Sequence, residues 1–426
     1  MRNENSAFAA TAEPLLDIET LRAETPGCEK VVHFNNAGCG LIASPVLETM
    51  LGHLRLEAEI GGYEAAALRT ENVAAFHAET AALLNAEARN IAFAGSATHA
   101  YANALSAIPF QAGDVILTTR NDFISNQIAF LALRRRFGVR IVHAPDLPEG
   151  GVDVEAMAAL MRGERPRLVA ATQIPTNSGL IQPVAEIGRY CREYDLLYLV
   201  DACQSVGQLE VDVTEIGCDF LTATCRKFLR GPRATGFLYA SDRVLAQGYE
   251  PLFIDMHGAR WTAPEEYQTA ATARRFEEWE MPYAAVIGSA EAVRYARGVG
   301  LPAIADRAAR LSADLRKLLA GVPNVRVLDR GARLGALVTV AVEGWEPEPF
   351  KQALDARGVN SALSFREFAQ FDFGVDQDVD WALRLSPHYY NTAAEVDAVV
   401  DAVRELTWTP RPARSRSSGT PGRTRR

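Results

Sequence analysis

The 426-residue sequence has only six cysteines, and they form neither a CxxC pair nor a spacing typical of metal ligands. This absence argues against a zinc-binding module and against a small secreted domain held together by disulfides. We therefore expect most of the cysteines to be small buried hydrophobic side chains in a reducing compartment. All six precede residue 226, at Cys28, Cys39, Cys191, Cys203, Cys218 and Cys225.

Long apolar runs and an excess of positive charge are missing as well. No apolar stretch approaches the roughly 18–20 residues that span a bilayer, and the N-terminal MRNENSAFAA lacks the layout of a signal peptide. The formal net charge of −9 argues against nucleic acid as the main partner. We expect a cytoplasmic protein that binds neither membrane nor nucleic acid.

Alternating helical and strand patterns divide the rest of the chain into two units. We predict a large domain at 31–280 and a smaller α+β domain at 281–408. They lie between an N-terminal segment at 1–30, with a short helix around 14–24, and a disordered basic tail at 409–426. That tail is rich in Arg, Ser, Pro and Gly and cannot bury an apolar core.

The strands expected in the large domain are apolar on both faces and alternate with helices. This pattern predicts an α/β domain with a mostly parallel sheet covered by helices on both sides. Ligands of such sheets bind beyond the carboxyl ends of the strands. The expected strands are 91–94, 115–118, 140–143, 168–172, 197–200, 220–223 and 236–239, and the helices are 46–59, 72–85, 98–107, 126–137, 154–162 and 184–193. In the smaller domain we expect helices at 281–297, 302–319, 349–356 and 394–406 and strands at 325–329, 335–342 and 383–386.

Two polar residues follow neighbouring strands of the expected sheet. Asp201 ends the apolar run LLYLV, and Lys227 lies in a Gly/Pro-rich turn after the next strand. Taken alone, the acid could cap a helix or form an ion pair, and the lysine could be a solvated loop residue. Together they suit pyridoxal chemistry, because an acid can keep a pyridine nitrogen protonated while a lysine forms a Schiff base with an aldehyde.

The segments around these residues resemble the class V aminotransferase and cysteine desulfurase family of pyridoxal-phosphate enzymes. The similarity runs from about residue 33 to residue 406 and is most specific in DACQSVGQ, RKFLRGPRATGFLY and LRLSPHYYNT. It implies the fold-type-I transferase architecture, pyridoxal 5′-phosphate as cofactor, a small-molecule amino-acid substrate and a homodimer. Members similar in kind include cysteine-conjugate carbon–sulfur lyases and isopenicillin N epimerase-like enzymes.

The resemblance implies a role for each matching cofactor residue. Lys227 would form the Schiff base and shuttle protons, Asp201 would pair with the pyridine nitrogen, and Gln204 would reach the phenolic oxygen. Phe123 stands where relatives place a histidine or another ring over the pyridine. Thr176 and Asn177 both remain candidates for a contact to the phenolic oxygen, because the register is ambiguous by one residue.

Phosphate and carboxylate binding are implied in the same way. Ala97 and Thr98, in FAGSATHAYANAL, match a phosphate-binding turn at a helix N-terminus, although an ordinary helix cap is the alternative. Thr224 and Arg226 are further phosphate candidates. The family's clamp for the substrate α-carboxylate corresponds to Arg384, and we also expect Arg366 to contact the substrate.

Two departures from the family separate this chain from the desulfurases. Desulfurases carry a nucleophilic cysteine shortly before the carboxylate-binding arginine, but here that stretch reads NSALSFREFAQFDF. In RRFEEWEMP, Glu280 cannot replace the threonine that relatives offer to the phosphate across a dimer interface. Other side chains considered for a role near the substrate are Cys39, Tyr63, His257, Arg260 and Trp261.

Three functions remain open from the sequence. The first is a β-eliminating carbon–sulfur lyase that releases a thiol or sulfenate, pyruvate and ammonia from a cysteine S-conjugate or its sulfoxide. The second is an aminotransferase or amino-acid epimerase. The third is a cofactor-binding scaffold without turnover, which the presence of the lysine, the acid and the carboxylate arginine disfavours.

Overall fold

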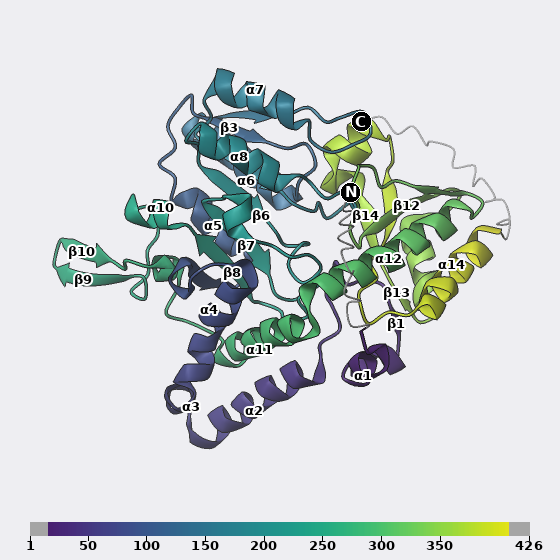
Figure 1. The fold of residues 1–426 in the computed structure, drawn as a ribbon, viewed down its shortest axis with the longest axis horizontal. Helices are drawn as coiled ribbons and strands as arrows, with labels where there is room; N and C mark the ends of the chain where they lie inside the picture. The colour runs from purple at the N-terminus through teal and green to yellow at the C-terminus, as the bar shows by residue number, and fades with distance from the viewer. Residues whose placement is uncertain (1–15, 409–426) are drawn as a thin grey trace, which may run out of the picture.

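The computed structural model describes residues 16–408, whose core is one seven-stranded sheet (Figure 1). The strand order is β2-β8-β7-β6-β5-β3-β4, and only β8 runs opposite to the other six. The predicted α/β class with a mostly parallel sheet is therefore confirmed. The strands are β2 (Ile91–Ala94), β3 (Val115–Thr118), β4 (Arg140–His143), β5 (Leu168–Thr172), β6 (Tyr198–Asp201), β7 (Phe220–Thr224) and β8 (Gly236–Ala240).

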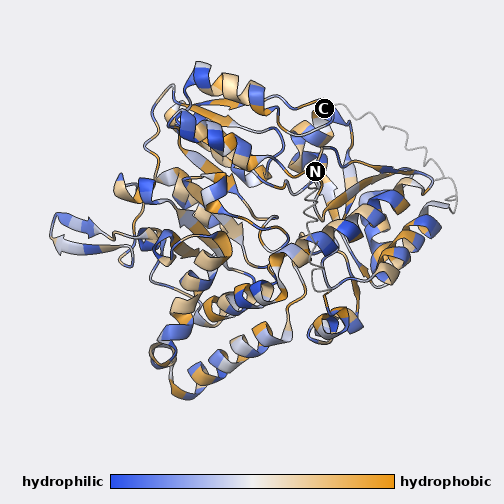
Figure 2. Ribbon diagram, in the orientation of Figure 1, coloured by the Kyte–Doolittle hydropathy of each residue, from blue (hydrophilic) through white to orange (hydrophobic). Residues whose placement is uncertain are grey.

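Helices cover both faces of this sheet because alternate strand residues point to opposite sides. Along β5, Val169 and Ala171 belong to one buried cluster, whereas Leu168 and Ala170 belong to another. The first cluster includes side chains of α4 (Thr70–Leu84), α7 (Val154–Glu164), α8 (Val184–Glu193) and α11 (Tyr283–Val299). The second includes side chains of α5 (Ala97–Ser106), α6 (Ile124–Phe137) and α10 (Asp242–Ala246). Figure 2 shows the apolar strands enclosed between these helices.

The C-terminal part of the chain builds a second, four-stranded sheet in the order β11-β12-β15-β14. All of its neighbouring strands are antiparallel. The strands are β11 (Val325–Val327), β12 (Val338–Val342), β14 (Ala362–Phe365) and β15 (Trp381–Leu385), and the accompanying helices are α12 (Leu301–Ala320), α13 (Pro347–Asp355) and α14 (Ala393–Trp408).

The packing departs from the predicted division at residues 31 and 281 in two places. Strand β1 (Val32–His33) pairs in parallel with β13 (Val359–Asn360), so it lies with the smaller unit. Helix α11 packs against α4 and α2 (Ser44–Ile60), so it lies with the larger one. The division of residues 31–408 into two folding units stays a prediction. Relative to the predicted boundaries, β1 packs with the smaller unit and α11 with the larger one. The expected tail at 409–426 and the first residues of the helix expected at 14–24 lie outside the described residues.

Several short or exposed elements were not predicted. The hairpin of β9 (Ala259–Ala263) and β10 (Glu266–Thr269) extends away from the body, and most of its residues are exposed on both faces (Figure 1). It therefore lacks the alternation that marks a half-buried strand. The short helix expected around 14–24 is observed as α1 (Ile18–Ala23), which begins after Asp17. Further elements that were not predicted are α3 (Gly62–Leu68), α9 (Val213–Ile216), the 3-10 turns η1 (Pro26–Glu29), η2 (Ala88–Asn90), η3 (Ala273–Phe276) and η4 (Arg366–Phe368), and the π-helical turn η5 (Gln370–Asp376).

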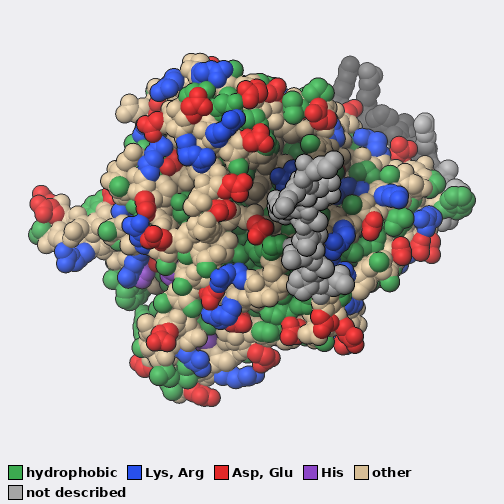
Figure 3. Space-filling model, viewed as in Figure 1, with side chains coloured by type: hydrophobic (Ala, Val, Ile, Leu, Met, Phe, Trp, Pro, Cys, Tyr) green, Lys and Arg blue, Asp and Glu red, His purple; other side chains and the backbone are tan. Residues whose placement is uncertain are grey.

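None of the helices within residues 16–408 combines the length and apolar character needed to cross a membrane. Over the same residues, no group of three or more His, Cys, Asp or Glu side chains is arranged to hold a metal ion. Acidic and basic side chains are interspersed on the face shown in Figure 3.

Candidate active site

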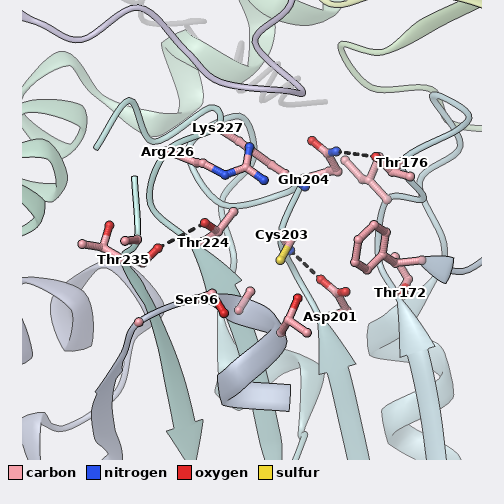
Figure 4. A pocket seen from close by; sticks show the side chains of 16 residues that line it. Ser96, Thr172, Thr176, Asp201, Cys203, Gln204, Thr224, Arg226, Lys227 and Thr235 are labelled. Carbon is pink, nitrogen blue, oxygen red and sulfur yellow. Dashed lines mark hydrogen bonds between the residues drawn. The ribbon is translucent and has the colours of Figure 1, made fainter. Parts of the chain in front are cut away.

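A cavity lies at the carboxyl ends of the parallel strands, where the loops after β2, β3, β5, β6 and β7 meet (Figure 4). Its empty space, which includes a part open to solvent, is about 550 Å³. The lining residues are Gly95, Ser96, Ala97, Thr98, Phe123, Thr172, Ile174, Thr176, Asp201, Cys203, Gln204, Thr224, Arg226, Lys227, Ala234 and Thr235.

Lys227 and Asp201 reach this cavity from neighbouring strands. Asp201 is the last residue of β6 and is 4% exposed, and Lys227, at 7%, lies in the turn after β7. Lys227 Nζ is 6.0 Å from the centre of the Phe123 ring. Burial lowers the pKa of Lys227, which favours the neutral amine needed for attack on an aldehyde.

A glycine allows the turns that carry Asp201 and Lys227 to pack together. Gly207, in DACQSVGQ, has a φ of +90°, and a Cβ at this position would lie only 2.3 Å from the backbone nitrogen of Leu229. Any larger residue would push the 201–208 turn away from the Lys227 turn. This close approach fixes the lysine relative to Asp201.

The opposite end of the cavity suits a phosphate. Helix α5 begins at Ala97, with Ser96 as its N-cap accepting a hydrogen bond from the backbone nitrogen of His99 at 3.0 Å. Unpaired backbone N–H groups in the first turn of a helix attract anions. The Thr224 hydroxyl and the Arg226 guanidinium face the same space, and Arg226 also donates to the carbonyl of Gly38.

A hydrogen-bonded group links the cavity to the smaller sheet. The Thr176 hydroxyl accepts from Gln204 Nε2 at 3.0 Å and from Arg384 Nη1 at 3.0 Å. Within residues 16–408, Gln204 Oε1 and Arg384 Nε are buried and have no hydrogen-bond partner. Burial, assisted by the charge of Arg226, lowers the pKa of Arg384 to about 10. A buried cation without an acid partner is costly, so this position favours an incoming anion.

Together these groups fit pyridoxal phosphate. The Asp201 carboxylate suits the ring nitrogen, and the Lys227 amine suits the aldehyde. The Phe123 ring can cover the pyridine face. The N-terminus of α5, with nearby hydroxyls and a guanidinium, suits the phosphate. The unpartnered Gln204 Oε1 is a polar group that a bound ligand or water would satisfy.

Most of the predicted cofactor residues therefore meet in one place, whereas three predicted residues, Asn177, Arg366 and Arg384, are not part of the lining. Asn177 is buried outside the lining, where its side chain donates to the Phe368 carbonyl at 2.9 Å. Arg366 also lies outside it and pairs with Asp378 and Asp380 at 2.8 and 3.0 Å. Of the two residues between which the sequence register was ambiguous, Thr176 lines the cavity and Asn177 does not. Of the two arginines, Arg384 is better placed because it contacts Thr176.

The remaining candidates lie elsewhere. Tyr63 and His257 border a groove beside α3 and α4, and Glu280 lines an adjoining groove. Arg260 and Trp261 belong to the exposed β9–β10 hairpin. Cys39 is a partly exposed free cysteine next to Gly38, whose carbonyl binds Arg226.

Several lining residues were missed by sequence reasoning. Ser96 carries an available signal, since a serine before a helical pattern is a typical N-cap. Thr172 and Cys203 follow strand ends, which are the expected positions of ligand-binding residues in such sheets. Thr235 is brought in by tertiary structure: it accepts a hydrogen bond from Thr224 at 3.1 Å through its carbonyl oxygen.

Comparison with known proteins agrees with this geometry. The sequence model of the aminotransferase class-V family matches residues 32–399. A probable cysteine desulfurase of Methanothermobacter thermautotrophicus is 26% identical over 400 residues, covering 91% of this chain and 98% of the relative. A probable hercynylcysteine sulfoxide lyase of Mycobacterium tuberculosis is 28% identical over 378 residues, covering 88% and 90%. The apo structure of a cysteine desulfurase from Thermococcus onnurineus superimposes with a TM-score of 0.84 at 23% identity, covering 93% of this chain and 99% of that one.

Proposed function

The chain belongs to the aminotransferase class-V family of pyridoxal-phosphate enzymes, and we propose that it is a lyase that cleaves the carbon–sulfur bond of a cysteine S-conjugate or its sulfoxide. The Cβ–S bond breaks, and the sulfur leaves as a thiol, or as a sulfenate from the sulfoxide. With one water, the remaining three-carbon unit becomes pyruvate and ammonia. Sulfur is released to solution and is not transferred to the protein.

The main observation behind this proposal is the sequence of the stretch in which desulfurases have their nucleophilic cysteine. Residues 360–373 contain no thiol and form β14, η4 and part of η5. The end of this stretch is held against the larger unit through η5, where Arg120 pairs with Asp376 at 2.5 Å and its guanidinium lies 5.1 Å from the Phe371 ring centre. The Cys203 thiol does line the cavity, but burial raises its pKa, which disfavours the nucleophilic thiolate.

Each of these cavity residues has its own role in the proposed elimination. When bound, pyridoxal phosphate supplies an aldehyde that joins amino groups and a ring that accepts electrons from Cα. Arg384 binds the substrate carboxylate. Lys227 takes the proton from Cα and returns a proton to the leaving sulfur. Asp201 keeps the ring nitrogen protonated, and Phe123 packs against the ring.

The similarity to a probable hercynylcysteine sulfoxide lyase supports a substrate of this class. The name of that relative describes a lyase acting on a cysteine sulfoxide conjugate, which is the second of the two proposed substrate types.

An aminotransferase or amino-acid epimerase is the alternative, and Phe123 is the observation that bears on it. A phenyl ring can stack on the cofactor but cannot exchange protons, so Lys227 is left as the proton carrier on that side of the cavity. A single proton carrier suits elimination and transamination equally. Only the products of the reaction therefore distinguish a lyase from an aminotransferase.

We propose to incubate the purified holoenzyme with S-methylcysteine or its sulfoxide and to measure pyruvate, ammonia and released thiol. Many turnovers of equimolar pyruvate and ammonia, with a retained cofactor spectrum, support the lyase. L-Alanine is the matched control, since it can be transaminated but has no leaving group. Pyruvate from alanine in the presence of a keto acid, without activity on the sulfur substrates, would replace the lyase with an aminotransferase.

We also propose that the active form is a cytoplasmic homodimer. The free state of all six cysteines supports a reducing compartment. Phe253 and Trp261, 89% and 78% exposed on or near the projecting hairpin, support a partner surface. Light scattering of the purified protein tests the dimer, and a monomeric active enzyme contradicts it.

A further inference from the structure

Two buried carboxylates are joined by a single amide beneath the candidate cofactor site. Asn126 Nδ2 donates to Asp122 Oδ1 at 2.9 Å and to Asp201 Oδ2 at 3.0 Å. Asp122 is 8% exposed, compared with 4% for Asp201. An NH₂ group has two hydrogens, so Asn126 can serve both acids at once.

Asp122 is surrounded by hydrogen-bond donors. Its carboxylate accepts from the backbone nitrogen of Phe123 at 2.6 Å, from Gln127 Nε2 at 2.7 Å and from the Thr172 hydroxyl. Such a donor set favours the ionised form. Burial nevertheless raises the pKa of Asp122 to about 6, and the donors only partly oppose this effect.

No basic side chain of the described residues forms a direct ion pair with either of these acids. Within residues 16–408, no Lys, Arg or His side chain forms an ion pair with Asp122 or Asp201. Two buried carboxylates without a direct ion pair are costly, and a positive charge bound at Asp201 would relieve both. Asp201 Oδ1 accepts from the backbone nitrogen of Cys203 at 2.9 Å, and the residue lines the cavity where that charge would sit.

We propose that Asp122 is a positioning residue that acts through Asn126 on Asp201. The Asn126 amide orients the Asp201 carboxylate, and the negative charge of Asp122 adds to that of Asp201. Together they hold a proton on the ring nitrogen of the bound cofactor. This inference rests on pyridoxal phosphate being the cofactor, but it is independent of which reaction follows.

The test compares two cofactors that differ only at the ring nitrogen. Apoprotein is titrated with pyridoxal phosphate and with 1-deazapyridoxal phosphate, which has a carbon in place of that nitrogen and cannot be protonated there. The preference of the unaltered protein for pyridoxal phosphate measures how strongly the site favours the protonated ring. We expect Asp122→Asn to reduce this preference about tenfold, equivalent to one pKa unit.

Asp219→Asn is the matched control. Asp219 is also a buried acid whose pKa burial raises, but it precedes β7 at the opposite edge of the sheet and binds the backbone nitrogen of Tyr198 at 3.0 Å. Its replacement should leave the preference unchanged. If Asp122→Asn weakens both cofactors equally, or changes neither, Asp122 has no effect on the ring proton and the proposal is overturned.

A second variant guards against loss of folding. Circular dichroism of each apoprotein shows whether it has folded. If Asp122→Asn does not fold, the same comparison of cofactors is made with Asn126→Ala. Because Asn126→Ala removes the bridge and leaves both acids, it should also lower the preference selectively. No substrate is used, so failure of the proposed lyase reaction would leave this result unaffected.

Discussion

Arg384 donates from one guanidinium nitrogen to both the carbonyl oxygen and the hydroxyl of Thr176, at 3.1 and 3.0 Å. Arg384 lies in β15 of the smaller sheet, and Thr176 follows β5 of the larger one. This contact brings a buried guanidinium from one sheet to the edge of a cavity built on the other. The position of this guanidinium at the cavity therefore depends on how the two sheets are placed.

Replacing Arg384 with alanine should impair substrate binding more than cofactor binding. The variant loses a charge-assisted contact to the α-carboxylate, so we expect kcat/KM to fall by about 10- to 100-fold, mainly through KM. Steady-state kinetics with a cysteine S-conjugate measures this effect. Arg366→Ala is the control, because Arg366 pairs with Asp378 and Asp380 at the surface. An equal loss in both variants contradicts the assignment.

Thr176→Val should disturb the site more than Asn177→Ala. Valine keeps the shape of threonine but removes the oxygen that accepts from both Gln204 and Arg384. The Asn177 side chain instead donates to the Phe368 carbonyl. We expect about a tenfold loss of kcat/KM in Thr176→Val and a smaller one in Asn177→Ala. The reverse order assigns the contact to residue 177.

Lys227→Ala should abolish both activity and the visible absorbance of the lysine-bound cofactor. No other side chain lining the cavity offers an amine. Absorbance after reconstitution and a turnover assay check the two effects. Lys317→Ala, on α12, is the control and should keep both. Activity in the Lys227 variant at the wild-type level refutes the central assignment.

Cofactor incorporation should reach its full rate at lower pH than for an ordinary lysine. Burial lowers the pKa of Lys227 from 10.5, so a larger fraction is neutral at any given pH below that value. The rate of Schiff-base formation by apoprotein, followed by absorbance from pH 7 to 10.5, should level off before pH 10.5. A rate that still rises steeply there indicates an unshifted amine.

Glu277→Gln should destabilise the fold at neutral pH. Burial alone would raise the pKa of Glu277, but hydrogen bonds from His257, His77 and the Phe93 backbone nitrogen outweigh it and lower the pKa from 4.5 to about 2. Such a carboxylate contributes stability above pH 4.5, on the order of 3 kcal/mol, that is lost as the pH falls towards 2.

Urea unfolding of both proteins across this pH range measures the difference in free energy. It should be large at pH 7 and should shrink steadily below pH 4.5. Glu278→Gln is the matched control, since Glu278 is exposed and contacts only His99 at 3.3 Å. A pH-independent difference between wild type and Glu277→Gln would attribute the effect to packing alone.

Strands with clear apolar patterns were predictable and others were not. The run LLYLV predicts β6, and the structure ends this strand at Asp201, one residue beyond the predicted end. The β9–β10 hairpin has exposed residues on both faces and thus no periodicity to recognise. Helix α11 was predicted as a helix, but its place beside α2 and α4 depends on which apolar face it buries.

The candidate site likewise has residues whose roles were predictable from the sequence and contacts that were not. Lys227, Asp201 and Gln204 stand in distinctive local motifs, so their roles could be inferred from the resemblance. The Asp122–Asn126–Asp201 bridge could not, because it joins side chains from the loop after β3, the first turn of α6 and the end of β6.

The amino-acid sequence by itself determined the α/β class, the family, the cofactor and the absence of a cysteine from the 360–373 stretch. These properties depend on local patterns and residue identities, which are readable along the chain. Tertiary structure alone decided that Thr176 rather than Asn177 lines the cavity, that Arg366 pairs with surface acids, and that Arg384 reaches Thr176 from the smaller sheet. Each of these depends on the rotation of a side chain and on neighbours far away in sequence, which packing of the two sheets selects.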